Sequence, residues 1–364
     1  MACQRVDCRS FQILHCYWSD VGKFRHFWIM EFFPMGLLNY ISLARKLYLE
    51  LRKQKRFNKS FLVPYLSELE NRFQGKFRPE QKERILGYYG LFIPSFLCSS
   101  YKRLGGKTLS EEERKRATLF GILTPVGDDL FDIDHLDISQ IREIALSPES
   151  YRAESFSAKV AREIQLYELT SVPFPKEYLE ASKNVLEIQI ETLRQKQKNI
   201  TPEQLEHITC AKGADSVIIF HQCLDETADP AMLECLYLVG SLYQLGNDIF
   251  DLYKDVRDNI YNLINTCDDF NKLRTYFLEK VREQNQRILG LSFPEKNKKE
   301  FCIIVNVINA RSMVGLDQFV RLQEKKGHKI DWWESQRKEM IIDMEKPKNI
   351  LRWMQYLRKL SALR

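Results

Sequence analysis

Two short acidic segments hold the residue types in this chain that could do chemistry. The first contains Asp128, Asp129 and Asp132, and the second runs from Asn247 to Asp255. Carboxylate and amide oxygens are the ligands that Mg²⁺ prefers, and Mg²⁺ commonly shares its remaining coordination positions with water and substrate phosphates. The two segments therefore predict a magnesium site that accepts a diphosphate.

The second segment, read as a helix, separates a polar face from an apolar face. The polar face contains acidic, amide and basic side chains at helical spacing, namely Asn247, Asp251, Lys254, Asp255 and Asp258. The opposite face contains apolar side chains, namely Ile249, Leu252, Tyr253, Val256 and Ile260. Carboxylates that lie one turn apart repel one another and destabilise an isolated helix, so this face needs positive charge opposite it. A cluster of divalent cations would supply that charge.

The composition is typical of a soluble globular protein. The chain has 364 residues, of which 44% are hydrophobic and 29% charged, and its formal net charge is +6. Because the basic residues are dispersed among acidic ones, we expect no nucleic-acid partner. The nine cysteines are scattered and form no Cys-x-x-Cys pair. This usage favours a reducing, cytoplasmic location over a disulfide framework or a zinc site.

Residues 1–35 lack a steady helical period, and we expect them to form an N-terminal extension outside the main fold. The longest apolar stretch in this region, residues 27–38, is interrupted by Glu31 and Pro34. It is too short and too broken to span a bilayer, so we expect no transmembrane segment.

Residues 36–364 are dominated by helical patterns. Apolar residues recur at helical spacing in six long stretches, namely residues 37–56, 79–97, 110–123, 175–198, 202–224 and 230–264. Hydroxyl residues ahead of acidic ones predict helix starts at Ser110, Ser147 and Thr201. Strand signals are nearly absent. The sequence therefore predicts an all-α fold, a single-domain helical bundle around a central active-site cavity.

The two acidic segments resemble the metal motifs of class I isoprenoid (terpenoid) synthases, a superfamily that includes terpene cyclases and prenyl-chain condensing enzymes. Asp128-Asp129-x-x-Asp132 is similar to the first aspartate-rich motif of the family. The second segment resembles the second metal motif of the cyclases, except that Asp251 and Asp255 stand where the cyclases have a hydroxyl residue and a glutamate. The resulting Asp-x-x-x-Asp is more similar to squalene and phytoene synthases, or to the cyclases that resemble tetraprenyl-β-curcumene synthase.

The resemblance implies an enzyme that ionises a prenyl diphosphate, releases pyrophosphate, and cyclises or rearranges the prenyl chain. It implies several Mg²⁺ ions, with Mn²⁺ as a substitute, bound by six side chains, namely Asp128, Asp129, Asp132, Asn247, Asp251 and Asp255. Lys254 would contact diphosphate oxygens. Lys212 and Gly213 precede the second motif, where the cyclases have a basic sensor residue and a helix break that exposes a carbonyl. A tight helix crossing is the other interpretation of Gly213.

Other functions stay open from the sequence. Prenyl-chain elongation is less favoured, because only the isolated Arg142 follows the first motif where head-to-tail prenyltransferases have an Arg-Arg pair. Head-to-head condensation stays open through Asp251 and Asp255. An all-α nucleotide pyrophosphohydrolase would also place carboxylates around Mg²⁺, although glutamate pairs usually dominate there. A non-catalytic helical interaction protein would need no Mg²⁺. A homodimer is open as well.

Overall fold

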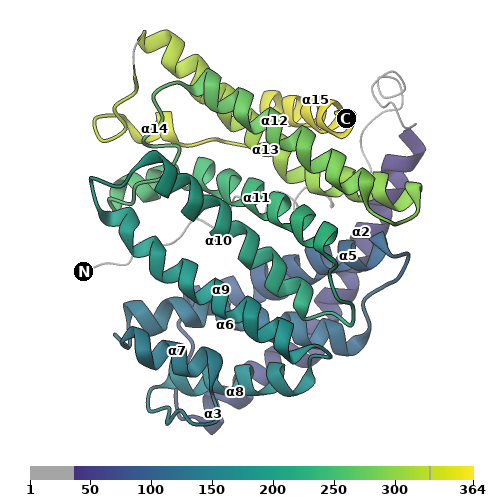
Figure 1. Cartoon of the computed structure of the whole chain (residues 1–364), viewed down its shortest axis with the longest axis vertical. Coiled ribbons are helices and arrows are strands. Elements are labelled where there is room, and N and C mark those ends of the chain that lie inside the picture. Colours follow the sequence, from purple (N-terminus) through teal and green to yellow (C-terminus); the bar gives the residue numbers. More distant parts are fainter. Residues whose placement is uncertain (1–36, 328) are drawn as a thin grey trace. The chain divides into compact units, whose positions relative to one another are not determined.

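The computed structural model describes residues 37–327 and 329–364, and every regular element in these residues is a helix (Figure 1). This confirms the predicted all-α class. The expected N-terminal extension, residues 1–35, lies outside the described residues. Within the described part of the chain, no helix combines the length and the apolar character needed to cross a membrane. The six cysteines that the structure describes are free thiols.

The described chain divides into two compact units. Unit 1 contains residues 37–186 and 219–227, and unit 2 contains residues 187–218 and 228–364. The first acidic segment belongs to unit 1 and the second to unit 2. The prediction that residues 36–364 form a single domain around a central cavity stays a prediction.

The helices follow one another with short connections. Those of unit 1 are α2 (Leu37–Phe57), the π-helix η2 (Asn58–Leu62), α3 (Val63–Arg72), α4 (Pro79–Arg84), the π-helix η3 (Ile85–Cys98), α5 (Ser99–Leu104), α6 (Glu111–Asp132), α7 (Ile138–Leu146) and α8 (Phe156–Ser171). Two helices contribute residues to both units, namely α9 (Pro175–Glu191) and α10 (Pro202–Gln222). The others belong to unit 2, namely the 3-10 helix η4 (Thr192–Lys196), α11 (Pro230–Arg257), α12 (Phe270–Gly290), α13 (Glu295–Lys326), α14 (Arg337–Met340) and α15 (Pro347–Ser361).

Capping side chains start the helices at two of the three predicted positions. Ser110 and Glu113 form a capping box at the start of α6, and Thr201 accepts the Gln204 N–H at the start of α10. The prediction at Ser147 is wrong, because this residue follows the last turn of α7, and the next helix begins only at Phe156.

Two predicted helix ends are also wrong. The end of the 110–123 stretch is wrong because α6 continues through Pro125 to Asp132, packed along η3 and α8. The end of the 230–264 stretch is wrong because α11 stops at Arg257. Asn259 there adopts a left-handed conformation (φ 54°), and the Ile260 N–H bonds back to the Asp255 carbonyl. This is the hydrogen-bonding pattern of a Schellman cap.

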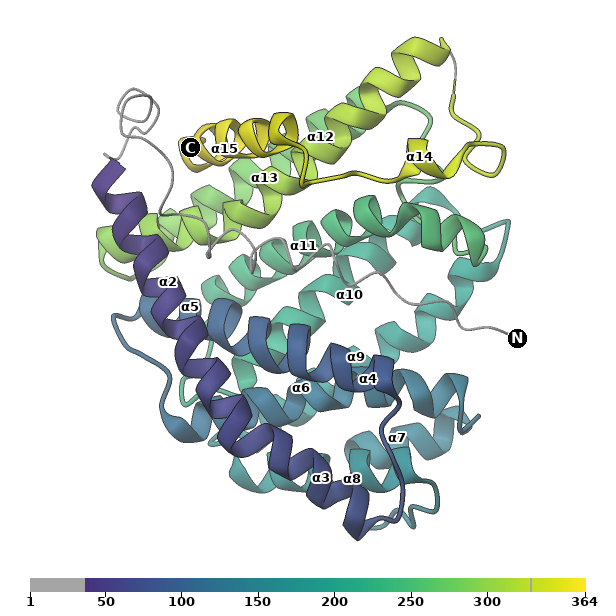
Figure 2. The same cartoon turned by 180° about the vertical axis from the view of Figure 1, so that it is seen from behind.

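Buried amide side chains fix α2 and η2 to η3, the helix that follows α4 in Figure 2. Gly90, which is buried, lies within η3; its backbone carbonyl faces two amide side chains of the preceding helices. That carbonyl accepts the side-chain amides of Gln54 and Asn58 at 2.8 and 2.9 Å. The helical core of unit 1 therefore depends on polar contacts as well as on apolar packing.

Helix α11 has the predicted apolar and polar faces. Ile249 and Leu252 are completely buried, whereas Asn247, Asp251 and Lys254 are exposed. The apolar face packs on α12 and α13 within unit 2. The faces that were predicted for these five residues are confirmed.

Helix α10 is unbroken at Gly213, which lies against Gly240 of α11. A Cβ atom on Gly213 would lie 2.1 Å from the Gly240 carbonyl oxygen, and a Cβ atom on Gly240 would lie 2.3 Å from the Gly213 carbonyl oxygen. The interpretation of Gly213 as a helix break is therefore wrong, and the tight helix crossing is confirmed. Lack of a side chain is required at both positions.

Replacing Gly240 by Ala should destabilise the protein by about 1 to 3 kcal/mol, because the added methyl group forces two backbones apart in a packed core. Gly290→Ala is the matched control, since nothing lies within 4 Å of a Cβ at that position. Chemical denaturation of both variants measures the difference. Equal stability of the two variants would contradict the close crossing.

Candidate functional site

The candidate site in unit 2 is an acidic face of α11. Gln244, Asp248, Asp251 and Asp255 follow one another at spacings of three or four residues and therefore lie along one side of the helix. Asp248 is buried. It accepts hydrogen bonds from the Gln244 amide at 2.8 Å and from the hydroxyl of Thr209, in α10, at 3.2 Å. A buried carboxylate is thus held between two neighbouring helices.

Burial, together with repulsion among the carboxylates, raises the pKa values of two residues of this face. Burial raises the pKa of Asp255 to about 7, and repulsion by Asp248 and Asp251 adds to that shift. Burial likewise raises the pKa of Asp248 to about 6, against the opposing effects of the Gln244 hydrogen bond and the Lys212 ammonium. The face therefore carries negative charge that the neighbouring residues only partly balance, and a cation would be favoured there.

The predicted residues of unit 2 divide into three groups. Asn247, Asp251 and Lys254 are exposed on α11, and Asp255 is half-buried and accepts the Asn262 amide at 2.7 Å. Lys212 is half-buried on α10 and acts electrostatically on Asp248. Gly213 is buried in the helix crossing.

Sequence reasoning did not select Asp248, although it lies inside the acidic segment. At helical spacing Asp248 falls between the polar face and the apolar face, so the spacing did not assign it to either. The spacing to Gln244 and Asp255, four residues before and seven after, was the signal that could have found it. Thr209 and Asn262, the hydrogen-bond donors from other segments, have no comparable signal.

The first acidic segment, in unit 1, is balanced by arginines of α4 and the residue before it. Arg84 forms an ion pair with Asp128 at 2.8 Å. Arg78 pairs with Asp129, which also accepts the Gln81 amide at 3.0 Å. Burial raises the pKa of Asp129 even though Arg78 opposes the shift.

The side chain of Asp132, the third predicted ligand of this segment, lies outside the described residues. The carboxylates of Asp128 and Asp129 already form ion pairs with arginines. Their negative charge is therefore balanced without a metal ion.

The oxygen donors of α11 fit Mg²⁺ better than those of the first segment do. Among the residues that the structure describes, no three His, Cys, Asp or Glu side chains are close enough to hold a metal ion by themselves. Mg²⁺ is usually bound by only one or two carboxylates, with water and phosphate oxygens completing the octahedron. Asp251 and Asp255 could be these two carboxylates, because both offer oxygen ligands on a face whose negative charge is only partly balanced by neighbouring cations.

A cavity of about 340 Å³ lies in unit 2, and its lining includes none of the predicted site residues and no carboxylate of the acidic face. Thr209, which donates to Asp248, is among its lining residues. Its walls include Leu242, Leu245 and Leu263, and Tyr276 lies at its polar side, bonded to a glutamate. Thr209 therefore connects this cavity to the buried carboxylate, which does not itself line it.

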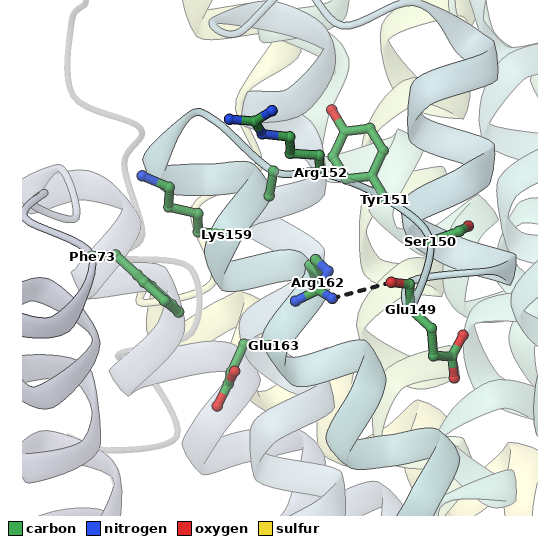
Figure 3. A pocket seen from close by; sticks show the side chains of 9 residues that line it. Phe73, Glu149, Ser150, Tyr151, Arg152, Lys159, Arg162 and Glu163 are labelled. Carbon is green, nitrogen blue, oxygen red and sulfur yellow. Dashed lines mark hydrogen bonds between the residues drawn. The ribbon is translucent and has the colours of Figure 1, made fainter.

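A second cavity, of about 420 Å³, lies in unit 1, and its lining includes no predicted site residue. Figure 3 shows Arg162 between Phe73 and Glu149, with its hydrogen bond to the Glu149 carbonyl at 3.3 Å. Arg152 and Lys159 line the same cavity. Acidic groups nearby, Glu149 among them, offset these cations, so the cavity has no clear preference for an anion.

No protein-family model, no curated protein and no solved structure matches the chain. The resemblance of the acidic segments to isoprenoid synthase motifs therefore stays a prediction that rests on the residues themselves.

The raised pKa of Asp255 predicts how stability depends on pH in the absence of metal. The folded-state pKa of about 7 lies above the usual value of 3.8. The folded protein therefore binds the proton more tightly than the unfolded chain, and stability falls as the pH rises from about 4 to about 7. Asp255→Asn should remove this loss. The variant should be more stable than the wild type by at least about 1 kcal/mol at pH 8, with little difference at pH 4.

Denaturation in EDTA across this pH range measures the effect. Asp258→Asn is the control, because Arg257 lowers the pKa of Asp258 and no such stabilisation is expected. If Asp255→Asn destabilised the protein equally at every pH, the described repulsion would be wrong.

Proposed function

We propose that the chain is a Mg²⁺-dependent enzyme of the class I isoprenoid synthase type, which ionises a prenyl diphosphate and cyclises or rearranges its prenyl chain. The observation that carries the proposal is the acidic face of α11, where burial and, after it, repulsion among Asp248, Asp251 and Asp255 raise the pKa values of Asp248 and Asp255. Such a face is costly to keep without a cation. The all-helical architecture is compatible with the proposal.

Each residue of this face has a distinct role in the proposal. Asn247, Asp251 and Asp255 would hold Mg²⁺, which supplies positive charge for the departing diphosphate. Lys254 and Lys212 would donate to diphosphate oxygens, where negative charge develops as the carbon–oxygen bond breaks. Asp248 accepts hydrogen bonds from Thr209 and Gln244. It would act as a positioning residue whose negative charge lies next to the residues that hold Mg²⁺.

The first segment contributes by resemblance. Asp128, Asp129 and Asp132 stay predicted Mg²⁺ ligands, and the first two would have to exchange their arginine partners for a cation. Arg84 and Arg78 would then have free donors for phosphate oxygens, which arginine binds well.

A second candidate function is the condensation of two prenyl diphosphates, and one specific observation favours it. The missing Arg-Arg pair after the first motif counted against head-to-tail chain elongation, but Arg78 and Arg84 contact this motif from an earlier part of the chain. Two guanidinium groups could hold a second diphosphate. Analysis of the hydrocarbon products separates the candidates, because cyclisation keeps the carbon number of the substrate and condensation adds the carbon numbers of two substrates.

Pyrophosphate should stabilise the protein against heat only when Mg²⁺ is present, because the acidic face cannot accept an anion before a cation. At about a hundred times its dissociation constant the ligand should contribute about 2.7 kcal/mol. Thermal unfolding with and without EDTA measures the shift. The same shift in both conditions, or none in either, would contradict the proposed site and favour an interaction protein.

Asn247→Ala and Asp251→Ala should lower turnover on the order of a hundredfold or more, because the lost ligand stabilises leaving-group charge in the transition state. Both side chains are exposed, so stability without metal should stay level, or rise for Asp251→Ala as repulsion is relieved. Ile249→Ala, on the buried face, should instead cost about 2 to 5 kcal/mol of stability.

Asp258→Asn serves as the control that changes an aspartate outside the proposed ligands. Pyrophosphate release from prenyl diphosphates of several chain lengths, together with melting in EDTA, measures all four variants. Full activity of Asn247→Ala and Asp251→Ala would refute the proposed function.

A further inference from the structure

Helix α15 has one buried face and one exposed face. Leu360 and Leu357 are 1% and 9% exposed, and the Trp353 indole N–H donates to the Val307 carbonyl of α13 at 2.9 Å. Figure 1 shows α15 beside α12 and α13, which are its main packing partners in unit 2. The inner face of this helix is therefore fully used by the fold.

The exposed face combines apolar side chains with cations. Leu351 and Met354, three residues apart, are 53% and 41% exposed. Every charged side chain of the helix is basic, namely Lys348, Arg352, Arg358 and Lys359. The helix therefore combines two exposed apolar side chains with cations and has no carboxylate. This pattern is typical of a surface that binds both apolar chains and anions.

A neighbouring arginine strengthens the need for an anion. Arg321 of α13 is close enough to Arg352 for the two guanidinium groups to repel each other, and burial together with this repulsion lowers the pKa of Arg321. Asp317, an acidic residue nearby, is already bonded to Arg274 at 2.9 Å and to the Tyr356 hydroxyl at 2.7 Å. Asp317 and, to a lesser extent, Glu324 offset the repulsion on Arg321 only in part.

We propose that the exposed face of α15 docks unit 2 on an anionic lipid bilayer. Leu351 and Met354 would enter the boundary between headgroups and acyl chains, while Lys348, Arg352 and Lys359 bind lipid phosphates. A bilayer fits better than a nucleic acid, because a phosphate backbone offers no apolar contact for the two exposed apolar side chains. This inference goes beyond the proposed catalytic function and does not depend on it.

The test is co-sedimentation of the full chain with vesicles of phosphatidylcholine alone and of phosphatidylcholine mixed with phosphatidylglycerol. The wild type should bind the anionic vesicles, bind the neutral ones far more weakly, and be released by salt. Leu351→Glu/Met354→Glu and Lys348→Glu/Arg352→Glu should each weaken binding at least tenfold. Lys348, Leu351 and Met354 are exposed and Arg352 is half-buried. Unchanged melting temperatures check that the variants are folded.

Two controls are matched to these variants. Leu193→Glu places one such negative charge, half the charge change of the apolar double variant, at an apolar residue that is 47% exposed elsewhere in unit 2. Lys183→Glu/Lys198→Glu makes the same charge change at two exposed lysines outside α15. Both controls should bind anionic vesicles like the wild type. Failure of the wild type to bind anionic vesicles, equal binding to neutral ones, or an equal loss in the controls would overturn the proposal.

Discussion

The close contact of α10 and α11 at Gly213 and Gly240 is the constraint on which the candidate site in unit 2 depends. Because neither residue has a side chain, the two backbones approach closely enough for Thr209 to donate to Asp248. A side chain at the crossing would separate the helices and remove a donor from a buried carboxylate. The charged form of that carboxylate would then be less stable. Backbone packing in this unit therefore helps to set the electrostatics of the acidic face.

A buried ladder of amides plays a similar role between α12, α13 and α15. Asn306 donates to Asn285 at 2.9 Å, and Asn309 donates to Gln284 at 3.2 Å. Asn285 in turn donates to the Leu360 carbonyl near the end of α15, at 2.7 Å. Buried polar groups need such partners, and a shift of one helix along another would break several bonds together. The ladder thus fixes the position of α15 along its neighbours, and with it the direction of the exposed face.

Features that depend on local contacts could be predicted from the sequence, and features that depend on distant partners could not. The cap at Ser110 and the buried side of α11 at Leu252 follow from residue type and helical period. The end of α11 also has a local signal, since Asn259 adopts the left-handed conformation that Asn commonly takes at a helix end. By contrast, Arg84 and Asp128 are 44 residues apart in the sequence, and no local pattern predicts that they form a pair. The arginine partners of the first segment had to come from the structure.

The two acidic segments differ in how their charge is balanced, and this difference affects how each would bind Mg²⁺. At Asp128 and Asp129 a metal ion must displace a guanidinium, so binding there breaks an ion pair. At Asp255 a metal ion relieves repulsion between carboxylates of one helix, so binding there removes a cost. A bare cation at the first segment would leave two guanidinium groups without their carboxylate partners, whereas a diphosphate that arrives with the metal can accept their N–H donors. Under the proposed function, binding of metal and substrate at the first segment is therefore coupled, because only the pair replaces every charge interaction that is lost.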